Sequence, residues 1–285
     1  MKVCVVTGGG SGMGLEAAKI IGKEKVIVIS GRTKEKLEKA VKQLEGLGIK
    51  AFYKTCDTSK RKEVQELVKF ALTHGEVSTV INSAGLSPVM AKPEVILRVN
   101  ALGTVYVNQE FAKVMKKGGV IVDVASMAGY QLPEFIIPKK AYHFADTDEE
   151  LFIKKTLKRA SLAKRDPYQF SGFAYSISKH FVIWYAKKCA FELGPKGIRV
   201  VSLSPGLIAT DMGNAEKDDG MAASQIDATC EKRMGTPAGL GFALASLADE
   251  RNEYLAGTDV LVDGGTIAGI KQFKNPKYLK KMKIK

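Results

Sequence analysis

Four polar side chains follow one another in a fixed order along this sequence: Asn100, Ser126, Tyr175 and Lys179. Residues four apart in a helix share one face, so the Lys179 ammonium group would lie one turn from the Tyr175 hydroxyl. A tyrosine has an ordinary pKa of about 10, and a nearby ammonium group lowers that pKa because it favours the phenolate. Ser126 follows an apolar run, where a strand end would aim its hydroxyl at a substrate oxygen. These residue types predict proton transfer to or from a substrate oxygen.

A glycine-rich segment, residues 7–14, lies between the first predicted strand and the first predicted helix. Glycines let the backbone turn tightly and approach a pyrophosphate, and the N-terminus of a helix offers free N–H groups to it. Because the strand before and the helix after are both present, the segment indicates a dinucleotide-binding turn, with a ligand-free flexible turn as the alternative.

The residues after the second predicted strand bear on the choice of cofactor. An NAD-binding fold usually carries an acid here that accepts hydrogen bonds from the ribose hydroxyls, whereas this chain has Gly31 followed by Arg32. A cation at this place favours a 2′-phosphate, so we expect NADP as the preferred cofactor. In the alternative, Arg32 is a plain surface charge and NAD is also accepted. Asp57, after the third strand, can accept a hydrogen bond from the adenine amino group or can be an ordinary turn residue.

Valine- and isoleucine-rich runs alternate with helical patterns along nearly the whole chain. The predicted strands are 2–7, 26–30, 51–55, 79–82, 119–125, 199–204 and 259–262. The predicted helices are 15–22, 34–47, 60–73, 94–116, 174–193 and 238–248. This alternation predicts one α/β domain over residues 1–270, a doubly wound (Rossmann) sheet of about seven parallel strands, with an irregular insertion at 131–172.

These motifs resemble the short-chain dehydrogenase/reductase family over nearly the whole chain. The family's glycine pattern T-G-x-x-x-G-x-G matches residues 7–14, and its N-N-A-G turn matches 82–85, with Ser83 in place of the second asparagine. The proline–glycine turn that holds the nicotinamide carboxamide matches residues 205–210. The family's active-site tetrad matches the four polar residues described first.

The resemblance implies a role for each of the four. Tyr175 would donate a proton to a carbonyl oxygen or accept one from an alcohol, and Ser126 would hydrogen-bond the same oxygen. Lys179 would lower the pKa of the tyrosine and hold the nicotinamide ribose, while Asn100 would support a water that passes the proton onward. The cofactor supplies the hydride. The expected cofactor-binding residues are Gly8, Ser11, Gly12, Met13, Gly14, Arg32, Asp57, Thr58, Asn82, Ala84, Gly85, Tyr175, Lys179, Pro205, Gly206, Ile208 and Thr210.

Two departures from the usual family pattern point to a branch. Ser126 and Tyr175 lie much farther apart than in most members, and the segment 82–100 is short. Both features, and residues 262–265, resemble the branch that contains bacterial 3α-hydroxysteroid dehydrogenase/carbonyl reductase. We therefore expect a secondary alcohol or ketone substrate, with a hydroxysteroid or bile acid as the candidate.

The insertion contains a capping-box pattern at 147–150, followed by a partly amphipathic stretch that ends near 164–167. The predicted helix can be a surface decoration, can cover the substrate site, or can block a helix surface through which many family members form tetramers. We favour the last two readings. The final strand stays unobstructed, so we expect a homodimer through it, with Phe273 and Tyr278 of the C-terminal extension as apolar anchors on the partner.

Composition narrows the class of protein. The chain has 285 residues and a formal charge of +14, half of it from seven lysines in the tail 271–285. We interpret the tail as a solvated or partner-binding segment, and a nucleic acid is not the expected partner. Cys4, Cys56, Cys189 and Cys230 are scattered, which predicts buried thiols in a reducing compartment.

The sequence also bears on the location of the protein, on metal binding and on an alternative function. The three histidines are isolated from one another, so no metal site is expected. Apart from Met1 and Lys2, nothing precedes the apolar part of the first strand, and no apolar stretch has membrane-spanning length, so we expect a cytoplasmic protein without a signal peptide or a membrane contact. The alternative to an enzyme is a catalytically silent nucleotide-sensing protein that regulates a partner.

Overall fold

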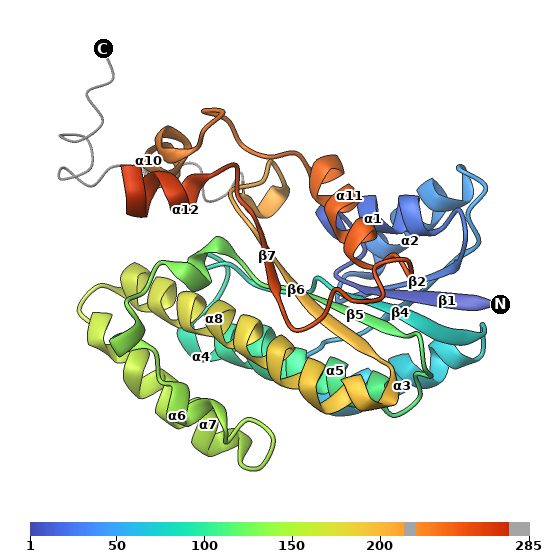
Figure 1. The fold of residues 1–285 in the computed structure, drawn as a ribbon, viewed down its shortest axis with the longest axis horizontal. Helices are drawn as coiled ribbons and strands as arrows, with labels where there is room; N and C mark the ends of the chain where they lie inside the picture. The colour runs from blue at the N-terminus through green and yellow to red at the C-terminus, as the bar shows by residue number, and fades with distance from the viewer. Residues whose placement is uncertain (214–220, 274–285) are drawn as a thin grey trace.

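A seven-stranded parallel β-sheet forms the centre of the computed structural model, which describes residues 1–213 and 221–273 (Figure 1). The strands are β1 (Lys2–Thr7), β2 (Val26–Gly31), β3 (Ala51–Thr55), β4 (Glu76–Asn82), β5 (Val120–Val124), β6 (Arg199–Pro205) and β7 (Asp259–Val262). Their order is β3-β2-β1-β4-β5-β6-β7. The chain adds strands on one side of β1 up to β3 and then on the other side from β4 on, and doubly wound sheets bind their ligands at this switch point between β1 and β4. The predicted fold class is confirmed.

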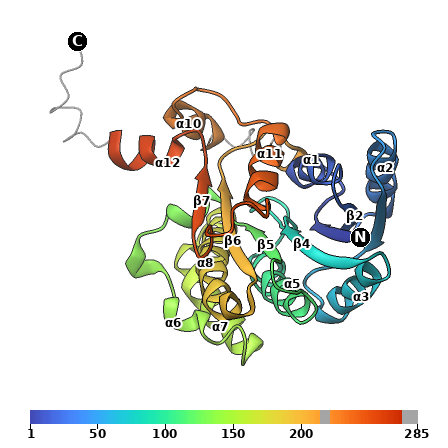
Figure 2. The same ribbon diagram turned by 45° about the vertical axis from the view of Figure 1, so that its right-hand side comes forward.

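Helices cover both faces of this sheet (Figures 1 and 2). They are α1 (Gly12–Ile21), α2 (Lys34–Glu45), α3 (Arg61–Leu72), α4 (Pro93–Leu97), α5 (Gly103–Ala112), α6 (Lys139–Tyr142), α7 (Glu149–Ala160), α8 (Pro167–Leu193), α10 (Met221–Ala228), α11 (Pro237–Leu247) and α12 (Thr266–Ala268). Helices α1, α2 and α11 lie on one face, and α3, α4, α5 and α8 on the other. Successive strand residues point to opposite faces, so Val5 and Val6 belong to two separate apolar cores.

The predicted helix 94–116 is wrong in its continuity. Helix α4 ends at Leu97, a π-helical turn (Arg98–Leu102) follows, and α5 ends at Ala112. Inside that turn the Asn100 side chain bonds the backbone of Leu86: Nδ2 donates to the carbonyl oxygen at 3.0 Å and Oδ1 accepts from the N–H at 2.8 Å. Wide turns of this kind are frequent at functional sites, which fits the prediction for Asn100.

Two helix starts in the region 131–172 also differ from prediction. Helix α8 begins at Pro167 and not at 174, because Asp166 caps it by accepting hydrogen bonds from the N–H groups of Tyr168 and Gln169 at 2.8 and 3.1 Å. Helix α7 is capped by Asp148, one residue after the predicted position, and its Oδ1 accepts from the Leu151 N–H at 2.9 Å. The insertion therefore supplies α6, α7 and the first turns of α8.

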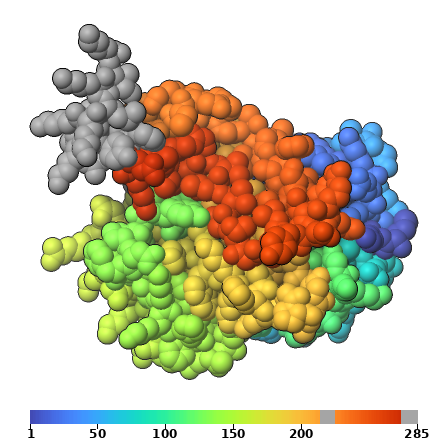
Figure 3. Space-filling view, viewed as in Figure 1, coloured from blue at the N-terminus to red at the C-terminus, as the bar shows by residue number. Residues whose placement is uncertain are grey.

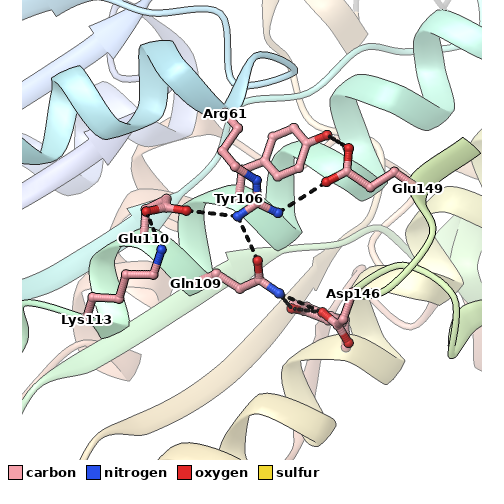
Figure 4. Close-up of polar contacts among 8 residues, drawn as sticks. Arg61, Tyr106, Gln109, Glu110, Lys113, Asp146 and Glu149 are labelled. Atoms are coloured by element: carbon pink, nitrogen blue, oxygen red, sulfur yellow. Dashed lines mark hydrogen bonds and ion pairs between the residues drawn. The ribbon is translucent and has the colours of Figure 1, made fainter.

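Helix α7 packs on the outer side of α4 and α8. Its phenylalanine Phe152 is buried in the core shared with α8, and its acidic first turn bonds the body of the protein (Figure 4). Glu149 accepts from Arg61 Nη2 at 3.2 Å and from Tyr106 Oη at 2.5 Å. Just before the helix, Asp146 pairs with Lys188 of α8 at 3.0 Å. Polar and apolar contacts together fix the insertion on the helix layer.

The other predictions from the sequence have mixed outcomes. Cys4, Cys56 and Cys189 are buried, but Cys230 is exposed because it lies in a loop after α10, so the expectation of a buried thiol is wrong there. His180 is partly buried and contacts the Tyr142 hydroxyl at 3.2 Å. Among the described residues there is no group of three or more metal-ligating side chains, and no helix is long and apolar enough to cross a membrane. From residue 274 on, the predicted tail, including Tyr278, lies outside the described residues.

Candidate active site

A cavity of about 390 Å³ opens at the carboxyl ends of β5 and β6. Its wall includes Ser126 and Tyr175, which come from the segment after β5 and from α8. Besides Tyr175, five residues expected to bind the cofactor line the same cavity: Met13, Pro205, Gly206, Ile208 and Thr210. The structure thus brings two of the four polar residues together with the glycine-rich turn and the proline–glycine turn.

Ser126 is held by local backbone geometry. It caps a short 3-10 helix, Met127–Tyr130, and its Oγ accepts a hydrogen bond from the Ala128 N–H at 3.2 Å. The side chain is buried at the end of β5, as the sequence predicted, and its hydroxyl hydrogen can be donated to a substrate oxygen because the bond from Ala128 uses Oγ as an acceptor.

Tyr175 and Lys179 lie one turn apart on α8, as their spacing predicts. The Lys179 Nζ is 5.9 Å from the centre of the Tyr175 ring and donates to the Val124 carbonyl oxygen at 2.9 Å. Lys179 is buried, and burial lowers the pKa of its ammonium group to about 8, with the negative charge of Asp123 acting in the opposite direction. Tyr175 is half-buried at the cavity wall.

Asn100 lies beside the lysine and outside the cavity wall. In addition to the Leu86 backbone, its Nδ2 donates to Ser178 Oγ at 3.2 Å. A Cβ built on Gly85 would lie 3.2 Å from Asn100 Oδ1 and 3.4 Å from Lys179 Nζ. The N-x-A-G turn therefore runs between the asparagine and the lysine, and a side chain at position 85 would crowd both.

The glycine-rich turn has the close packing that a dinucleotide-binding turn needs. Gly8 has a φ of +67°, and a Cβ there would lie 2.8–2.9 Å from the backbone of Ser83 and Ala84. A Cβ on Gly14 would lie 2.5 Å from Ser83 Oγ. Because only glycine fits, the backbone at the start of α1 stays uncovered, and its N–H groups suit the pyrophosphate of NAD(P).

The other expected cofactor residues lie where the adenosine half would extend along the sheet. Arg32 directly follows β2, is exposed, and forms no ion pair with another described residue. Asp57 Oδ1 accepts from the Ser59 N–H at 3.0 Å, so this carboxylate also has the turn role that the sequence left open. Thr58 is buried against α5: a Cβ on Gly103 would lie 3.1 Å from its Oγ1.

Sequence reasoning missed two groups of residues. Asp123 of β5 is fully buried and its charge acts on Lys179, and a charged residue inside an apolar strand was a visible signal for it. The second group completes the cavity wall, and apart from Leu207, which belongs to the proline–glycine turn, no motif identifies its members. They are Pro88, Met127, Ala128, Gln131, Tyr168, Gln169, Gly172, Phe173, Leu207, Met212, Gly213 and Gln225.

Comparison with known proteins identifies the family. The family model described as short chain dehydrogenase matches residues 2–138, and the one described as Enoyl-(Acyl carrier protein) reductase matches residues 156–266. The protein named Short-chain dehydrogenase/reductase bsc3 from Alternaria brassicicola is 30% identical over 264 residues, which cover 91% of this chain and 94% of that protein. The chain belongs to the short-chain dehydrogenase/reductase family. As a member, it is an NAD(P)-dependent oxidoreductase that acts on a CH–OH group, so the enzymatic prediction is confirmed and the silent sensor is set aside.

Further relatives agree with this short-chain dehydrogenase/reductase assignment. The protein named Dehydrogenase/reductase SDR family member 4 from Bos taurus is 28% identical, over 94% of this chain and 88% of that protein. A solved short chain dehydrogenase from Burkholderia cenocepacia, in complex with NADP, superposes with a TM-score of 0.74 at 22% identity, over 93% of this chain and 97% of that one. That similarity supports the fold. The 3α-hydroxysteroid dehydrogenase branch stays a prediction.

Proposed function

We propose that this enzyme interconverts an uncharged secondary alcohol and its ketone, with NADP(H) as the preferred cofactor and NAD(H) as a weaker one. The main support for this proposal is that one cavity is lined both by Ser126 and Tyr175 and by the cofactor-side residues Met13, Gly206 and Ile208. A hydroxysteroid is the first substrate class to test, since a large apolar alcohol matches the lining of the cavity, and a bile acid would fit only with its carboxylate outside the cavity.

The lining supports an uncharged substrate. No charged side chain lines the cavity within the described part of the chain, and its polar members are neutral amides and hydroxyls such as Gln131, Gln169 and Tyr168. A carboxylate or phosphate buried there would lack a charged partner, which is unfavourable. Met127 and Met212 offer flexible apolar surface that adapts to the shape of a rigid ring system.

In the proposed reaction the protein moves the proton and holds the substrate oxygen. Tyr175 exchanges a proton with that oxygen, and Ser126 donates a hydrogen bond to it, which fixes its position. The buried Lys179 ammonium group stabilises a tyrosine phenolate across the 5.9 Å between Nζ and the ring. Asn100 and Lys179 both lie close to Gly85, and we expect Asn100 to support a water that passes the proton onward. The nicotinamide, when bound, supplies or accepts the hydride.

The test is a substrate panel followed through nicotinamide absorbance. Hydroxysteroids and neutral cyclic ketones are compared with short keto acids, each with NADP(H) and with NAD(H). We expect turnover with the neutral compounds and at least tenfold lower kcat/KM with the keto acids. Turnover restricted to the charged keto acids would contradict the proposed substrate class.

The cofactor preference is tested separately through Arg32→Ala. A lost contact between a guanidinium group and a 2′-phosphate weakens binding by about 1.5–3 kcal/mol, which is roughly a tenfold to hundredfold rise in Kd for NADP. The Kd for NAD should stay the same, because NAD has no 2′-phosphate. Equal effects on the two cofactors, or no effect, would show that Arg32 does not read the phosphate.

We further propose that the insertion shapes the substrate site and limits assembly to a homodimer. Tyr168, Gln169 and Phe173, on the early turns of α8, line the cavity, whereas α7 covers the outer surface of α4 and α8. Strand β7 ends the sheet with a free edge, and exposed aromatic side chains lie on the elements around it, among them Phe191 and Tyr254. Figure 3 shows the orange and red C-terminal segments as a band beside the yellow α8 on this face.

Sedimentation equilibrium tests this assembly on the full chain, on a chain truncated after Gly269, and on Phe191→Glu. We expect a dimer for the full chain and a weaker dimer for both variants. A stable tetramer would contradict the proposal, because it would show that α7 leaves the helix surface open to a partner.

A further inference from the structure

Asp123 carries a carboxylate in the interior of the protein, on the central strand β5. Its side chain has no exposed area. The Oδ1 atom accepts from Asn82 Nδ2 at 3.0 Å, and Oδ2 accepts from Asn108 Nδ2 at 2.7 Å. Two neutral amides hold the group in place, but they do not neutralise a buried negative charge, so a cation is needed nearby.

Lys179 is the cation whose charge acts on this carboxylate. It is buried, and its Nζ donates to the carbonyl oxygen of Val124, the residue next to Asp123. Among the described residues no carboxylate oxygen lies within 4 Å of Nζ, so the two charges attract each other across a longer distance, inside the protein where solvent screens them little. The other groups that face Asp123 are neutral: Asn82 from β4, Asn108 from α5 and Cys189 from α8. Burial raises the pKa of the Cys189 thiol to about 12, so it carries no charge near neutral pH.

We propose that Asp123 is a positioning residue whose carboxylate is the counter-charge that keeps the Lys179 ammonium group protonated and seated below Tyr175. This inference rests on the proposed role of Lys179 in the reaction. Through Asn82, the hydrogen bonds of Asp123 continue to the cofactor turn, because Thr7 Oγ1 donates to Asn82 Oδ1 at 2.8 Å and accepts from the Ala84 N–H at 3.2 Å. One buried set of hydrogen bonds thereby ties the carboxyl ends of β1, β4 and β5 to the counter-charge.

The directions of the pKa shifts agree with this geometry. Burial raises the pKa of the Asp123 carboxyl to about 6, while its two amide partners and Lys179 act in the opposite direction. The Lys179 pKa falls to about 8 through burial, and Asp123 raises it. Near pH 7, between these two values, both groups are charged, so the pair is at its strongest where the enzyme would work.

Asp123→Asn removes the charge and keeps the shape, and Glu110→Gln is the matched control. Glu110 is also a buried acid, but it pairs with Arg61 and Lys113 and not with Lys179. The readout is the Kd for NADPH, measured by fluorescence from about pH 6 to pH 10. Lys179 is expected to hold the ribose only when protonated, so affinity for NADPH should fall as the pH rises through a midpoint set by this lysine. We expect the midpoint to drop by about one pH unit or more in Asp123→Asn and to stay unchanged in Glu110→Gln. An unchanged midpoint in Asp123→Asn would overturn the proposal.

A stability cycle tests the pair without any use of cofactor or substrate. Asp123→Asn, Lys179→Met and the double variant are unfolded in urea at pH 7, and we expect the double variant to lose less than the two single losses combined. If Asp123→Asn does not fold, recovery of folding in the double variant supports the pair. Additive losses, or no recovery, would overturn it. Absence of NADPH binding by the unaltered enzyme at every pH would instead refute the proposed function. The urea cycle would still show whether Asp123 acts as the counter-charge of Lys179.

Discussion

Arg61→Met is expected to loosen the insertion from the helix layer (Figure 4). The Arg61 Nη1 donates to Glu110 and to Gln109, each at 2.8 Å, and Nη2 donates to Glu149 at 3.2 Å. The guanidinium carbon also lies 4.4 Å from the centre of the Tyr106 ring. Because these partners belong to α5 and α7 while Arg61 belongs to α3, a single side chain joins three elements. Methionine keeps much of the apolar length and removes the charge and the donors.

The magnitude follows from the exposure of the partners. Glu110 is 6% exposed, and a charge-assisted hydrogen bond to such a carboxylate contributes about 1.5–3 kcal/mol. Glu149 is 37% exposed, so solvent screens its pair with Arg61 and we assign it less than about 1 kcal/mol. Lys113 stays 2.7 Å from Glu110, so the carboxylate keeps a partner and the larger penalty for an isolated buried charge does not apply. The free energy of unfolding should fall by about 2–3 kcal/mol.

The assay is urea denaturation followed by the fluorescence of Trp184, the single tryptophan. Its ring contacts Tyr142 and His143 of the insertion, so it reports on the part that should loosen. Arg98→Met is the control, because its partner Glu150 is 75% exposed and the expected loss is below about 1 kcal/mol. A loss for Arg61→Met no larger than that of Arg98→Met would refute this account of how the insertion is held.

Two further predictions concern the cofactor turn and pH. Gly8→Ala should raise the Kd for NADPH at least tenfold in fluorescence titration, because its Cβ would meet the backbone of Ser83. Gly48→Ala is the control: at a φ of +74° it shares the backbone strain, but nothing lies within 4 Å of its Cβ, so NADPH binding should not change. Equal Kd values for the two variants would count against the tight turn. Burial lowers the pKa of His74 and His180, so the unfolded chain binds protons more readily than the folded protein. The free energy of unfolding should therefore fall as the pH drops below the ordinary histidine pKa of 6.5. In urea titrations the double variant His74→Gln/His180→Gln should depend less on pH in this range, and an unchanged pH dependence would contradict the role of these two histidines.

Local patterns in the sequence predicted most of the framework. Apolar runs and turn residues were enough for the seven strands, and the one-turn spacing of Tyr175 and Lys179 needed only helix geometry. The π-helical turn at Asn100 was not predictable, because its cause is a bond to the backbone of Leu86, which only tertiary structure brings near. The early start of α8 had a signal in Asp166 followed by a proline, which we interpreted as the end of the preceding helix.

The cavity wall shows the limit of motif-based prediction. Residues such as Gln131 and Phe173 come from separate elements and contact the same space only after folding, so no spacing in the sequence connects them. Asp123 had a visible signal as a charge within an apolar strand, but its partners Asn82 and Asn108 come from β4 and α5. Side chains that act through long-range contacts require the fold before their role can be inferred.

The most direct test of the central claim is the kcat of Tyr175→Phe with the best ketone from the panel and NADPH. The substitution removes only the hydroxyl that is proposed to exchange the proton, and the loss of a general acid typically lowers a rate by about 10²–10⁴-fold. We predict a fall of that size in kcat, with the Kd for NADPH within about threefold of the unaltered enzyme. Retention of more than a tenth of kcat would contradict the claim that Tyr175 carries the proton.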